Sequence, residues 1–378
     1  MTMLTITKNL EPRLLEIFHH LHSYPEISWE ETNTTAYIKG LLEEAGCKTQ
    51  TFSDCTGVVT EIGEGLPVVG IRSDLDALWQ EVDGCFQANH SCGHDAHMTM
   101  GMGALYALLK RGNLPAGRVR FIFQPAEEKG LGALKMIEKG VLDDVSYLFG
   151  VHLRPMKELR VGQASPSIEH GASRFLSGQI LGEDSHGAWP HMGPNAIEVG
   201  AALVHMLGSL HMNPMTPWSA KMTRLQAGGS SSNIIPGRAS FSLDLRAQTN
   251  EAMAALYDKV LNSVSAVSSN FGVKIETRLC ANIVAAQTDL QARNLMAGAI
   301  TRVLGSEKLH DPVVTPGGED FHHYCVTLPQ IKGTMLGLGC DLSPGLHHPQ
   351  MTFDKGSIAS GAAILAEAAI GALELCGR

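Results

Sequence analysis

A cysteine and a histidine two positions apart, Cys92 and His94, are the residues of this chain whose types and spacing point most directly to chemistry. Two adjacent carboxylates, Glu127 and Glu128, follow further along the chain. Thiolate, imidazole and carboxylate groups are the donors that a borderline-soft divalent metal ion prefers. One glutamate of such a pair can bind the ion while the other stays free to move protons. The combination therefore predicts metal-assisted hydrolysis rather than a structural zinc site.

Amide hydrolysis is a reaction that these groups could catalyse. A divalent ion polarises the carbonyl group and lowers the pKa of bound water from 15.7 to about 7. A free carboxylate beside the ion can take the proton of that water and deliver it to the leaving nitrogen. A thiolate that bridges could hold two ions, typically about 3.5–4 Å apart, so the residues also allow a two-metal site.

The elements that must position these residues follow from the hydrophobic pattern. Short apolar runs alternate with helical stretches, which predicts a mostly parallel, buried sheet. We expect strands at 57–62, 68–71, 119–123, 147–151 and 333–338, and helices at 9–22, 30–45, 95–111, 130–139, 287–304 and 355–374.

Polar clusters fall at the ends of several predicted strands. They are Asp74 and Asp76, Glu127 and Glu128, His152, and the pair His347 and His348. Ligands of open α/β sheets gather at the carboxyl ends of the strands, so we expect these clusters to converge. Gly93 permits the tight turn that lets Cys92 and His94 face the same point.

Residues 172–281 show a different order of predicted elements: strand, helix, strand, strand, helix, strand. This is the order of a ferredoxin-like α+β sandwich. Two domains are also the default for a chain of 378 residues. We therefore expect an α/β catalytic domain formed by 1–171 and 282–378, with a smaller domain formed by 172–281 inserted into it.

Composition excludes several classes of protein. The charge of −9 and the lack of a Lys/Arg stripe argue against nucleic-acid binding. No apolar stretch is expected to approach the ~20 residues of a membrane span. The first residues do not resemble a signal peptide, and the eight cysteines have no repeating spacing, which indicates reduced thiols. We expect a cytoplasmic protein that binds neither nucleic acid nor membrane.

Each candidate ligand also has a simpler interpretation. Cys92 alone could be a buried thiol, and adjacent glutamates usually lie on a solvated helix face. We expect six histidines to be structural, namely His19, His20, His205, His211, His322 and His323. The grouping of the other candidates at strand ends favours the metal site.

These residues resemble the motifs of a known family, the M20 metallopeptidases, and in particular its amidohydrolase branch. That branch contains hippurate hydrolase, bacterial N-acyl-amino-acid deacylases and plant auxin–amino-acid hydrolases. The resemblance covers essentially the whole chain. The matching segments are 21–28, 72–78, 92–95, 124–128, 186–191, 233–236, 317–321 and 346–349.

The resemblance implies a ligand set and a general base. Carried over by position, the metal ligands are Cys92, His94, Glu128, His152 and His347. The general base is Glu127, and Asp76 orients a ligand from outside the coordination shell. At the last ligand position the family pattern favours His347, with His348 as the alternative. The implied cofactor is a pair of divalent ions, which could be Mn, Zn, Co or Ni.

The family fold agrees with the expected organisation, because its catalytic α/β domain is interrupted by a small ferredoxin-like lid. The lid often carries the dimer contact, so a homodimer through 172–281 is expected. His186 matches a lid histidine that stabilises the oxyanion, in some members at the partner subunit's site. Asn233 and Arg246 match positions that hold the substrate carboxylate or carbonyl. A loop histidine and a surface ion pair remain the simpler interpretations of His186 and Arg246.

The implied activity is cleavage of N-acyl amino acids, as by an aminoacylase or hippurate hydrolase. A dipeptidase or carboxypeptidase of the same family is an alternative, disfavoured because peptidase branches more often have an acidic bridging ligand in place of Cys92. A non-catalytic metal- or ligand-binding homologue is a second alternative, disfavoured by Glu127. Trp79 and Trp189 depart from the family pattern, so the acyl group is left open.

Overall fold

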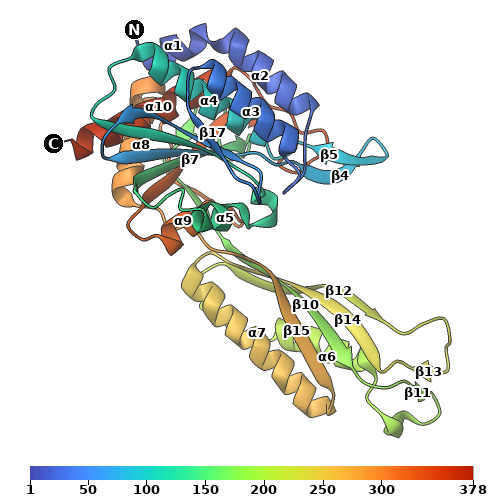
Figure 1. Cartoon of the computed structure of the whole chain (residues 1–378). Helices are drawn as coiled ribbons and strands as arrows, with labels where there is room; N and C mark the ends of the chain where they lie inside the picture. Colours follow the sequence, from blue (N-terminus) through green and yellow to red (C-terminus); the bar gives the residue numbers. More distant parts are fainter. Residues whose placement is uncertain (378) are drawn as a thin grey trace. The chain divides into compact units, whose positions relative to one another are not determined.

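The computed structural model describes residues 1–377, which form two compact units (Figure 1). Unit 1 contains Met1–Glu169, Gln287–Val314 and the residues from Asp320 onward, and unit 2 contains His170–Ala286 and Thr315–Glu319. The expected boundaries at 172 and 281 lie close to these. The sequence did not anticipate that 315–319 groups with unit 2, where the N–H of Gly171 donates to the carbonyls of Thr315 and Gly317.

The sheet of unit 1 is mixed, with a parallel centre. Its strands are, in spatial order, β1 (Thr49–Thr51), β2 (Val58–Glu64), β6 (Gly117–Gln124), β3 (Val68–Asp74), β7 (Val145–Pro155), β17 (Lys332–Leu342) and β8 (Ala164–Ser165). The four strands from β6 to β17 are parallel, and the outer ones are antiparallel. Every residue of β3 is buried, as a strand covered on both faces requires. The prediction of a mostly parallel, buried sheet is confirmed.

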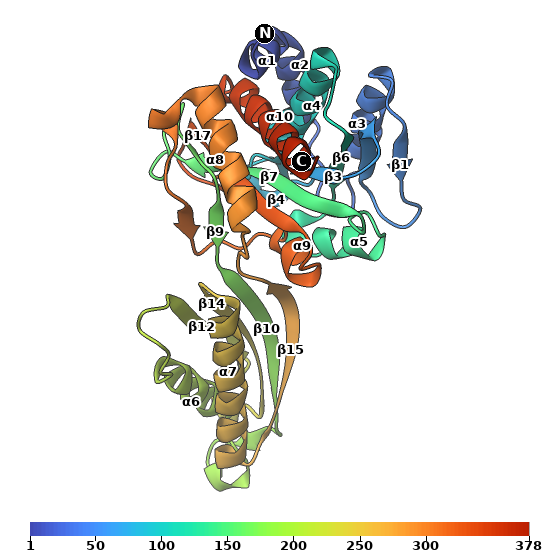
Figure 2. The ribbon, with the colours of Figure 1, turned by 90° about the vertical axis from the view of Figure 1, so that its left-hand side faces the viewer.

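Helices cover both faces of this sheet (Figures 1 and 2). On one face lie α1 (Met3–Asn9), α2 (Glu11–Ser23), α3 (Thr32–Glu44), α4 (His94–Arg111), α8 (Leu290–Leu304) and α10 (Ser357–Cys376). On the other lie α5 (Gly132–Glu138) and α9 (His322–Thr327). Each face therefore has its own apolar core.

The expectation that no apolar stretch approaches the length of a membrane span was wrong. Among the described residues, α10 has 20 residues and a mean hydropathy of 1.6, enough to cross a membrane by length and composition. However, 72% of this stretch is buried inside the structure, where α10 packs against α4 and α8. The central helix of a folded core has the same composition, so this feature is weak evidence for a membrane.

A β-hairpin lies between β3 and α4, where the sequence predicted no strand. Its strands are β4 (Leu78–Val82) and β5 (Cys85–Asn89), and the residues between them are Asp83 and Gly84. Both of these residues have positive φ angles, +50° and +84°. An Asp-Gly pair with positive φ at both positions is typical of a tight two-residue hairpin turn. This local signal could have predicted the hairpin.

Unit 2 is an antiparallel sheet covered by two helices. Its strands are, in spatial order, β12 (Trp218–Ala227), β14 (Arg238–Ala247), β10 (Ala172–Leu181) and β15 (Lys274–Ile283), and its helices are α6 (Ala196–Gly208) and α7 (Asn250–Phe271). Figure 2 shows α6 and α7 beside this sheet, and both contribute to one apolar core with its strands. Chain order and strand order together are those of the predicted ferredoxin-like sandwich.

Shorter elements complete the described chain. They are β9 (Ile168–His170) with β16 (Val313–Thr315), β11 (Ser185–His186) with β13 (Ile234–Ile235), and the 3-10 turns η1 (Glu127–Lys129), η2 (Pro190–Met192) and η3 (Ser306–Lys308).

A half-buried ion pair ties α2 to the start of α4. His22 Nδ1 lies 2.7 Å from Asp95 Oδ2, and the Asp95 side chain is 1% exposed. The hydrogen bond with Asp95 raises the pKa of His22. Burial is the largest single influence on Asp95 and raises its pKa, but the bond from His22, the charges of His90 and His22 and the N–H of Ala96 together lower the pKa. Asp95 also lies in the first turn of α4, where the helix dipole favours a negative charge. The pair therefore helps to fix the helix start that follows Gly93.

We predict that His22→Gln lowers the stability of the protein more at pH 5.5 than at pH 8.5. The raised pKa of His22 gives a stabilisation that is complete below about 6.5 and lost as pH rises through the folded pKa. The lowered pKa of Asp95 preserves its contribution down to about pH 4. Because His22 is half exposed, the effect should be about 1 kcal/mol.

Thermal unfolding in the presence of a chelator, at both pH values, measures this effect without a contribution from bound metal. His19→Gln is the matched control, because His19 is an exposed residue of the same helix. A loss of stability from His22→Gln that is equal at the two pH values would contradict the prediction.

Candidate metal centre

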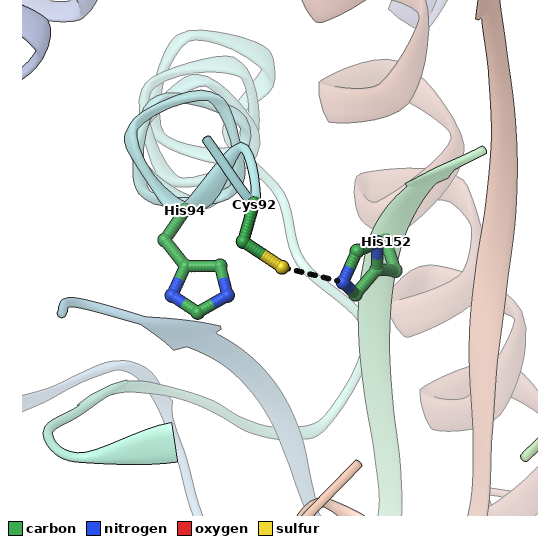
Figure 3. A group of neighbouring side chains, drawn as sticks. All are labelled: Cys92, His94 and His152. Carbon is green, nitrogen blue, oxygen red and sulfur yellow. Dashed lines mark hydrogen bonds between the residues drawn. The ribbon is translucent and has the colours of Figure 1, made fainter. Parts of the chain in front are cut away.

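The start of α4 brings two predicted ligands together. Gly93 has a φ of +90°, and a Cβ atom there would lie 2.8 Å from Leu153 Cδ1. Only glycine combines this left-handed backbone with so close an approach. The turn places Cys92 before the helix and His94 at its first position. Figure 3 shows both side chains on the side of the turn that faces His152 of β7.

The five predicted ligands lie in one cluster around the Cys92 sulfur. Cys92 Sγ is 3.5 Å from His152 Nε2 (Figure 3) and 3.3 Å from His347 Nε2. His347 Nε2 is 3.7 Å from Glu128 Oε1, which is 3.8 Å from His94 Nε2. Two groups of three closely spaced donors share the sulfur: Cys92, His94 and His152, and Cys92, Glu128 and His347.

The neighbouring imidazole of His348 has a different environment. Its Nδ1 accepts a hydrogen bond from the N–H of Gln350 at 3.1 Å, and the residue is exposed. In the described residues it belongs to none of the close donor groups. Of the two adjacent histidines, only His347 therefore lies at the cluster.

Hydrogen bonds set the ring nitrogens that face the cluster. His94 Nδ1 donates to the carbonyl of Asp76 at 2.8 Å, and His152 Nδ1 donates to the carbonyl of Leu153 at 2.8 Å. Each ring therefore directs Nε2 toward the other donors. A metal-binding histidine usually donates its other ring N–H to an acceptor such as a backbone carbonyl.

The donor atoms fit a bound cation. His94 Nε2 and Glu128 Oε1 are buried without a hydrogen-bond partner in the part of the chain that the structure describes. Burial raises the pKa of the Glu128 carboxyl to about 7, and burial raises the pKa of the Cys92 thiol well above its usual range. Without a cation these groups are therefore held toward their neutral forms, and a divalent ion would reverse this preference.

Glu127 lies beside the cluster. Its Oε2 is 3.9 Å from His94 Nε2, and its Oε1 accepts a hydrogen bond from the N–H of Asp320 at 3.2 Å. Asp320 in turn is fixed by its carboxylate, which accepts from Arg72 at 2.7 Å and from the N–H of Ala133 at 2.9 Å. Asp320 belongs to the motif at 317–321, but the sequence predicted no role for it.

Asp76 holds the double-glutamate segment by its backbone. Its Oδ1 accepts from the N–H of Glu127 at 3.1 Å and its Oδ2 from the N–H of Glu128 at 3.0 Å. Asp76 is fully buried, and the Ser28 hydroxyl also donates to its Oδ2 at 2.6 Å. Its position agrees with the predicted supporting role, because it contacts the backbone of the ligand-bearing segments and joins none of the close donor groups.

His97 lies three residues after His94 on α4, and the sequence did not predict a role for it. Its Nε2 accepts a hydrogen bond from the N–H of Leu153 at 3.1 Å, so its proton is on Nδ1 and is donated to Asp74 at 2.8 Å. Asp74 also binds Arg72 at 2.6 Å. This chain of contacts links β3 to the part of β7 that carries His152. The spacing of His97 from His94 on one helix could have indicated that both face the same side.

The segment that carries His347 is held from the β4–β5 hairpin. His347 has a φ of +62°, which is uncommon for a residue other than glycine. Gln80 Nε2 donates to the His347 carbonyl at 3.1 Å, and the His347 N–H donates to the Ser91 carbonyl at 2.8 Å. The Ser91 hydroxyl donates to Gln80 Oε1 at 2.5 Å, which closes the network. The hairpin that departs from the family pattern therefore supports one of the predicted ligands.

The predicted oxyanion-stabilising residue, His186, and the predicted substrate-binding residues, Asn233 and Arg246, lie in unit 2. His186 and Asn233 are both exposed and adjacent, because β11 pairs with β13 and the Gly187 N–H donates to the Asn233 carbonyl at 2.7 Å. Arg246 pairs with Ser173 near the opposite end of the sheet. Its guanidinium binds Asp244 at 2.7 Å and lies 5.0 Å from the centre of the Phe175 ring.

Comparison with known proteins identifies the family. Residues 70–370 match the sequence profile of peptidase family M20/M25/M40. A probable hydrolase of Synechocystis is 32% identical, with 98% of both chains covered. The chain belongs to this family. The resemblance that the motifs predicted is confirmed.

Two further relatives are informative. The N-acetyl-L-cysteine deacetylase of Bacillus subtilis is 31% identical over 95% of this chain and 88% of its own. The solved structure of the Bacillus subtilis YXEP protein, a dinuclear metal binding peptidase from the M20 family, has a TM-score of 0.82 and 30% identity. It covers 97% of this chain and 99% of that one.

Proposed function

We propose that this M20 family protein is a metal-dependent amidohydrolase that cleaves the amide bond of N-acyl amino acids. The observation that carries the proposal is Glu127, a carboxylate placed beside a cluster of five other donors. A deacetylase of an N-acetyl amino acid is among its relatives, which supports the substrate class. The free amino acid and a carboxylate are the expected products.

The cluster has the donors for two divalent ions. Cys92 would bridge them, with His94 and His152 completing one site and Glu128 and His347 completing the other. When bound, such ions polarise the amide carbonyl and lower the pKa of water. The dinuclear metal site of the YXEP protein supports this assignment. Thiolate, imidazole and carboxylate donors favour Zn, Mn, Co or Ni over Mg or Ca.

Glu127 is proposed as the general base. The Asp320 N–H holds one of its oxygens, which orients the carboxylate toward the cluster. Glu127 takes a proton from the attacking water and then delivers it to the amide nitrogen as the bond breaks. Asp76 maintains the orientation of the segment by binding the N–H of Glu127 and of Glu128.

We predict that Glu127→Gln keeps its metal but loses most turnover, by on the order of 10²–10⁴-fold in kcat. The amide retains the shape of the side chain but does not accept a proton. Hydrolysis of N-acetyl and N-benzoyl amino acids with added Mn²⁺, Zn²⁺ or Co²⁺ measures the loss, and metal analysis measures the content. Dipeptides in the same assay separate this activity from a peptidase.

The matched control is Glu138→Gln, the same change at a glutamate of α5 that pairs with Lys135 on the surface. It should leave turnover unchanged. Near wild-type rates for Glu127→Gln on every substrate that the wild type cleaves would show that Glu127 is not the base.

We predict that Cys92→Ala lowers the metal content of the purified protein from about two ions per chain to less than one, because the sulfur belongs to both donor groups. His347→Ala should lose only one ion. Cys340→Ala is the matched control, since Cys340 is a buried thiol outside the cluster. Equal metal content in Cys92→Ala and Cys340→Ala would exclude the bridging role.

We also propose a homodimer through unit 2. An apolar stripe on α6 is exposed, with Ile197 47% and Val204 45% accessible and Ala201 between them. The adjacent β12 is an edge strand of the described sheet. An exposed apolar stripe beside an unpaired strand edge favours association with a second copy, because a paired copy covers both.

The positions of the proposed substrate-binding residues support the same assembly. β11 follows the end of β10 at Leu181 and pairs with β13. Arg246 instead pairs with Ser173, at the start of β10. At ~3.4 Å per residue, about 25–30 Å of strand separates the two ends. An N-acyl amino acid is much shorter than this. We infer that Arg246 and the His186–Asn233 pair contact different substrate molecules, with His186 and Asn233 serving the partner's site.

We predict that two inactive variants, Glu127→Gln and His186→Ala, regain activity when their subunits are mixed. In a mixed dimer the chain with an intact Glu127 receives an intact His186 from its partner. The mixed sample should recover a fraction of the wild-type rate, because only mixed dimers contain one complete site. Adding Val204→Asp to both chains should abolish the recovery and produce monomers by light scattering.

A mixture that stays inactive while exchanging subunits would place His186 at the site of its own chain. Subunit exchange is followed independently with differently tagged chains.

A cytoplasmic location is proposed as well. All eight cysteines, which all lie in the described residues, are free thiols. Free thiols are typical of a reducing compartment. Cell fractionation tests this, and recovery in an oxidising compartment would contradict it.

A further inference from the structure

The segment that carries Glu127 and Glu128 begins with an unusual backbone conformation. Ala126 has φ and ψ of 53° and 41°, in the left-handed region. Residues other than glycine rarely adopt this region, and they do so only where their surroundings hold them. The next three residues form the short turn η1. The direction in which both glutamates leave the backbone therefore depends on whatever stabilises Ala126.

Three consecutive backbone N–H groups of this segment bind buried carboxylates. The N–H groups of Glu127 and Glu128 donate to Asp76. The N–H of Ala126 donates to Glu31 Oε1 at 2.8 Å. The left-handed residue is thus held by a carboxylate that lies 95 positions away in the sequence.

Glu31 has no exposed surface. It lies directly before α3, and its second oxygen accepts from the Thr56 hydroxyl at 2.6 Å. It belongs to none of the close groups of potential metal ligands in the described residues. Both oxygens of the carboxylate are therefore used to connect Thr56 with the Ala126 backbone.

The stretch between α2 and α3 supplies a second support at the same place. The Ser28 hydroxyl donates to the Asp76 carboxylate, and Ile27 forms a bridge with Ala77. Ser28 and Glu31 thus both come from the short loop between α2 and α3. Ser28 binds the Asp76 carboxylate, and Glu31 binds the N–H of Ala126. This loop overlaps the motif at 21–28, for which the sequence predicted no role.

We propose that Glu31 is a positioning residue for Glu127 and Glu128, acting through the backbone N–H of Ala126. Its kinetic consequence rests on the proposed function, since it assumes that Glu127 moves protons and Glu128 binds metal. Loss of the Glu31 carboxylate leaves the Ala126 N–H without its acceptor, and the left-handed turn without its tie to α3. The Glu127 and Glu128 side chains then leave the backbone in altered directions.

The test compares Glu31→Ala, Glu31→Gln and the control Glu26→Ala. The Glu26 carboxylate also binds the start of α3, and its hydrogen bonds in the described residues all go to Asn33 and Thr34. Glu26→Ala therefore weakens the same helix without touching the turn. The glutamine of Glu31→Gln can still accept from the Ala126 N–H with its oxygen and donate to Thr56 with its nitrogen.

For Glu31→Ala we expect kcat to fall on the order of 10–100-fold, with KM nearly unchanged and less metal bound per chain. Glu31→Gln should stay close to the wild type in both readouts. Glu26→Ala should lower the melting temperature while keeping kcat and metal content. If Glu31→Ala does not fold, Thr56→Val replaces it, since it removes only the donor to the second oxygen. It should lower kcat in the same direction by a smaller factor.

Wild-type values for kcat and metal content in Glu31→Ala would overturn the proposal. So would a loss in Glu31→Gln as large as in Glu31→Ala, because hydrogen bonding would then not be the cause. An equal loss of kcat in Glu26→Ala would show a general effect of weakening α3. Absence of metal-dependent amide hydrolysis in the wild type would instead refute the proposed function. The metal content of the variants would still show whether Glu31 holds the turn at Ala126 in place.

Discussion

The buried side chain of Asp76 connects three segments that are distant in sequence, and the geometry of the candidate site depends on it. Its carboxylate accepts the N–H groups of Glu127 and Glu128, and its carbonyl accepts the Nδ1 proton of His94. It belongs to none of the close donor groups in the described residues. One residue therefore orients donors at the end of β6 and at the start of α4. Ligand orientation is set by such supporting contacts as much as by the ligands themselves.

Charge in this region is only partly balanced within the protein. The buried Arg72 guanidinium binds Asp74 and Asp320, which support the cluster rather than form it. The pKa of Glu128 and that of the Cys92 thiol are both raised, with burial as the largest cause. Burial without a counter-charge favours the neutral forms of these groups. A divalent ion supplies the missing charge, so its binding is coupled to the release of protons.

The sequence was sufficient to predict the donor types and their convergence, because a parallel sheet brings strand ends to one edge. It was not sufficient to predict the hydrogen bonds that hold these donors in place. His97 takes its tautomer from the N–H of Leu153, and Gln80 binds the carbonyl of His347. Each of these contacts joins residues that meet only in the folded chain, and neither partner has a distinctive local pattern. The membrane-like composition of α10 was missed because Glu367 and Glu374 interrupt its apolar residues, most of which are buried in the core.

The residues proposed for metal binding and those proposed for substrate binding lie in different units. Every residue proposed for proton transfer or metal binding lies in unit 1, whereas His186, Asn233 and Arg246 lie in unit 2. Within unit 2, the His186–Asn233 pair and Arg246 lie near opposite ends of β10 and β14. In a dimer with two-fold symmetry, the same residues of the two copies have equivalent surroundings. A single chain would then contain the donors for its metals but only part of its substrate contacts. Association of two copies would therefore determine substrate binding while leaving the metal cluster intact.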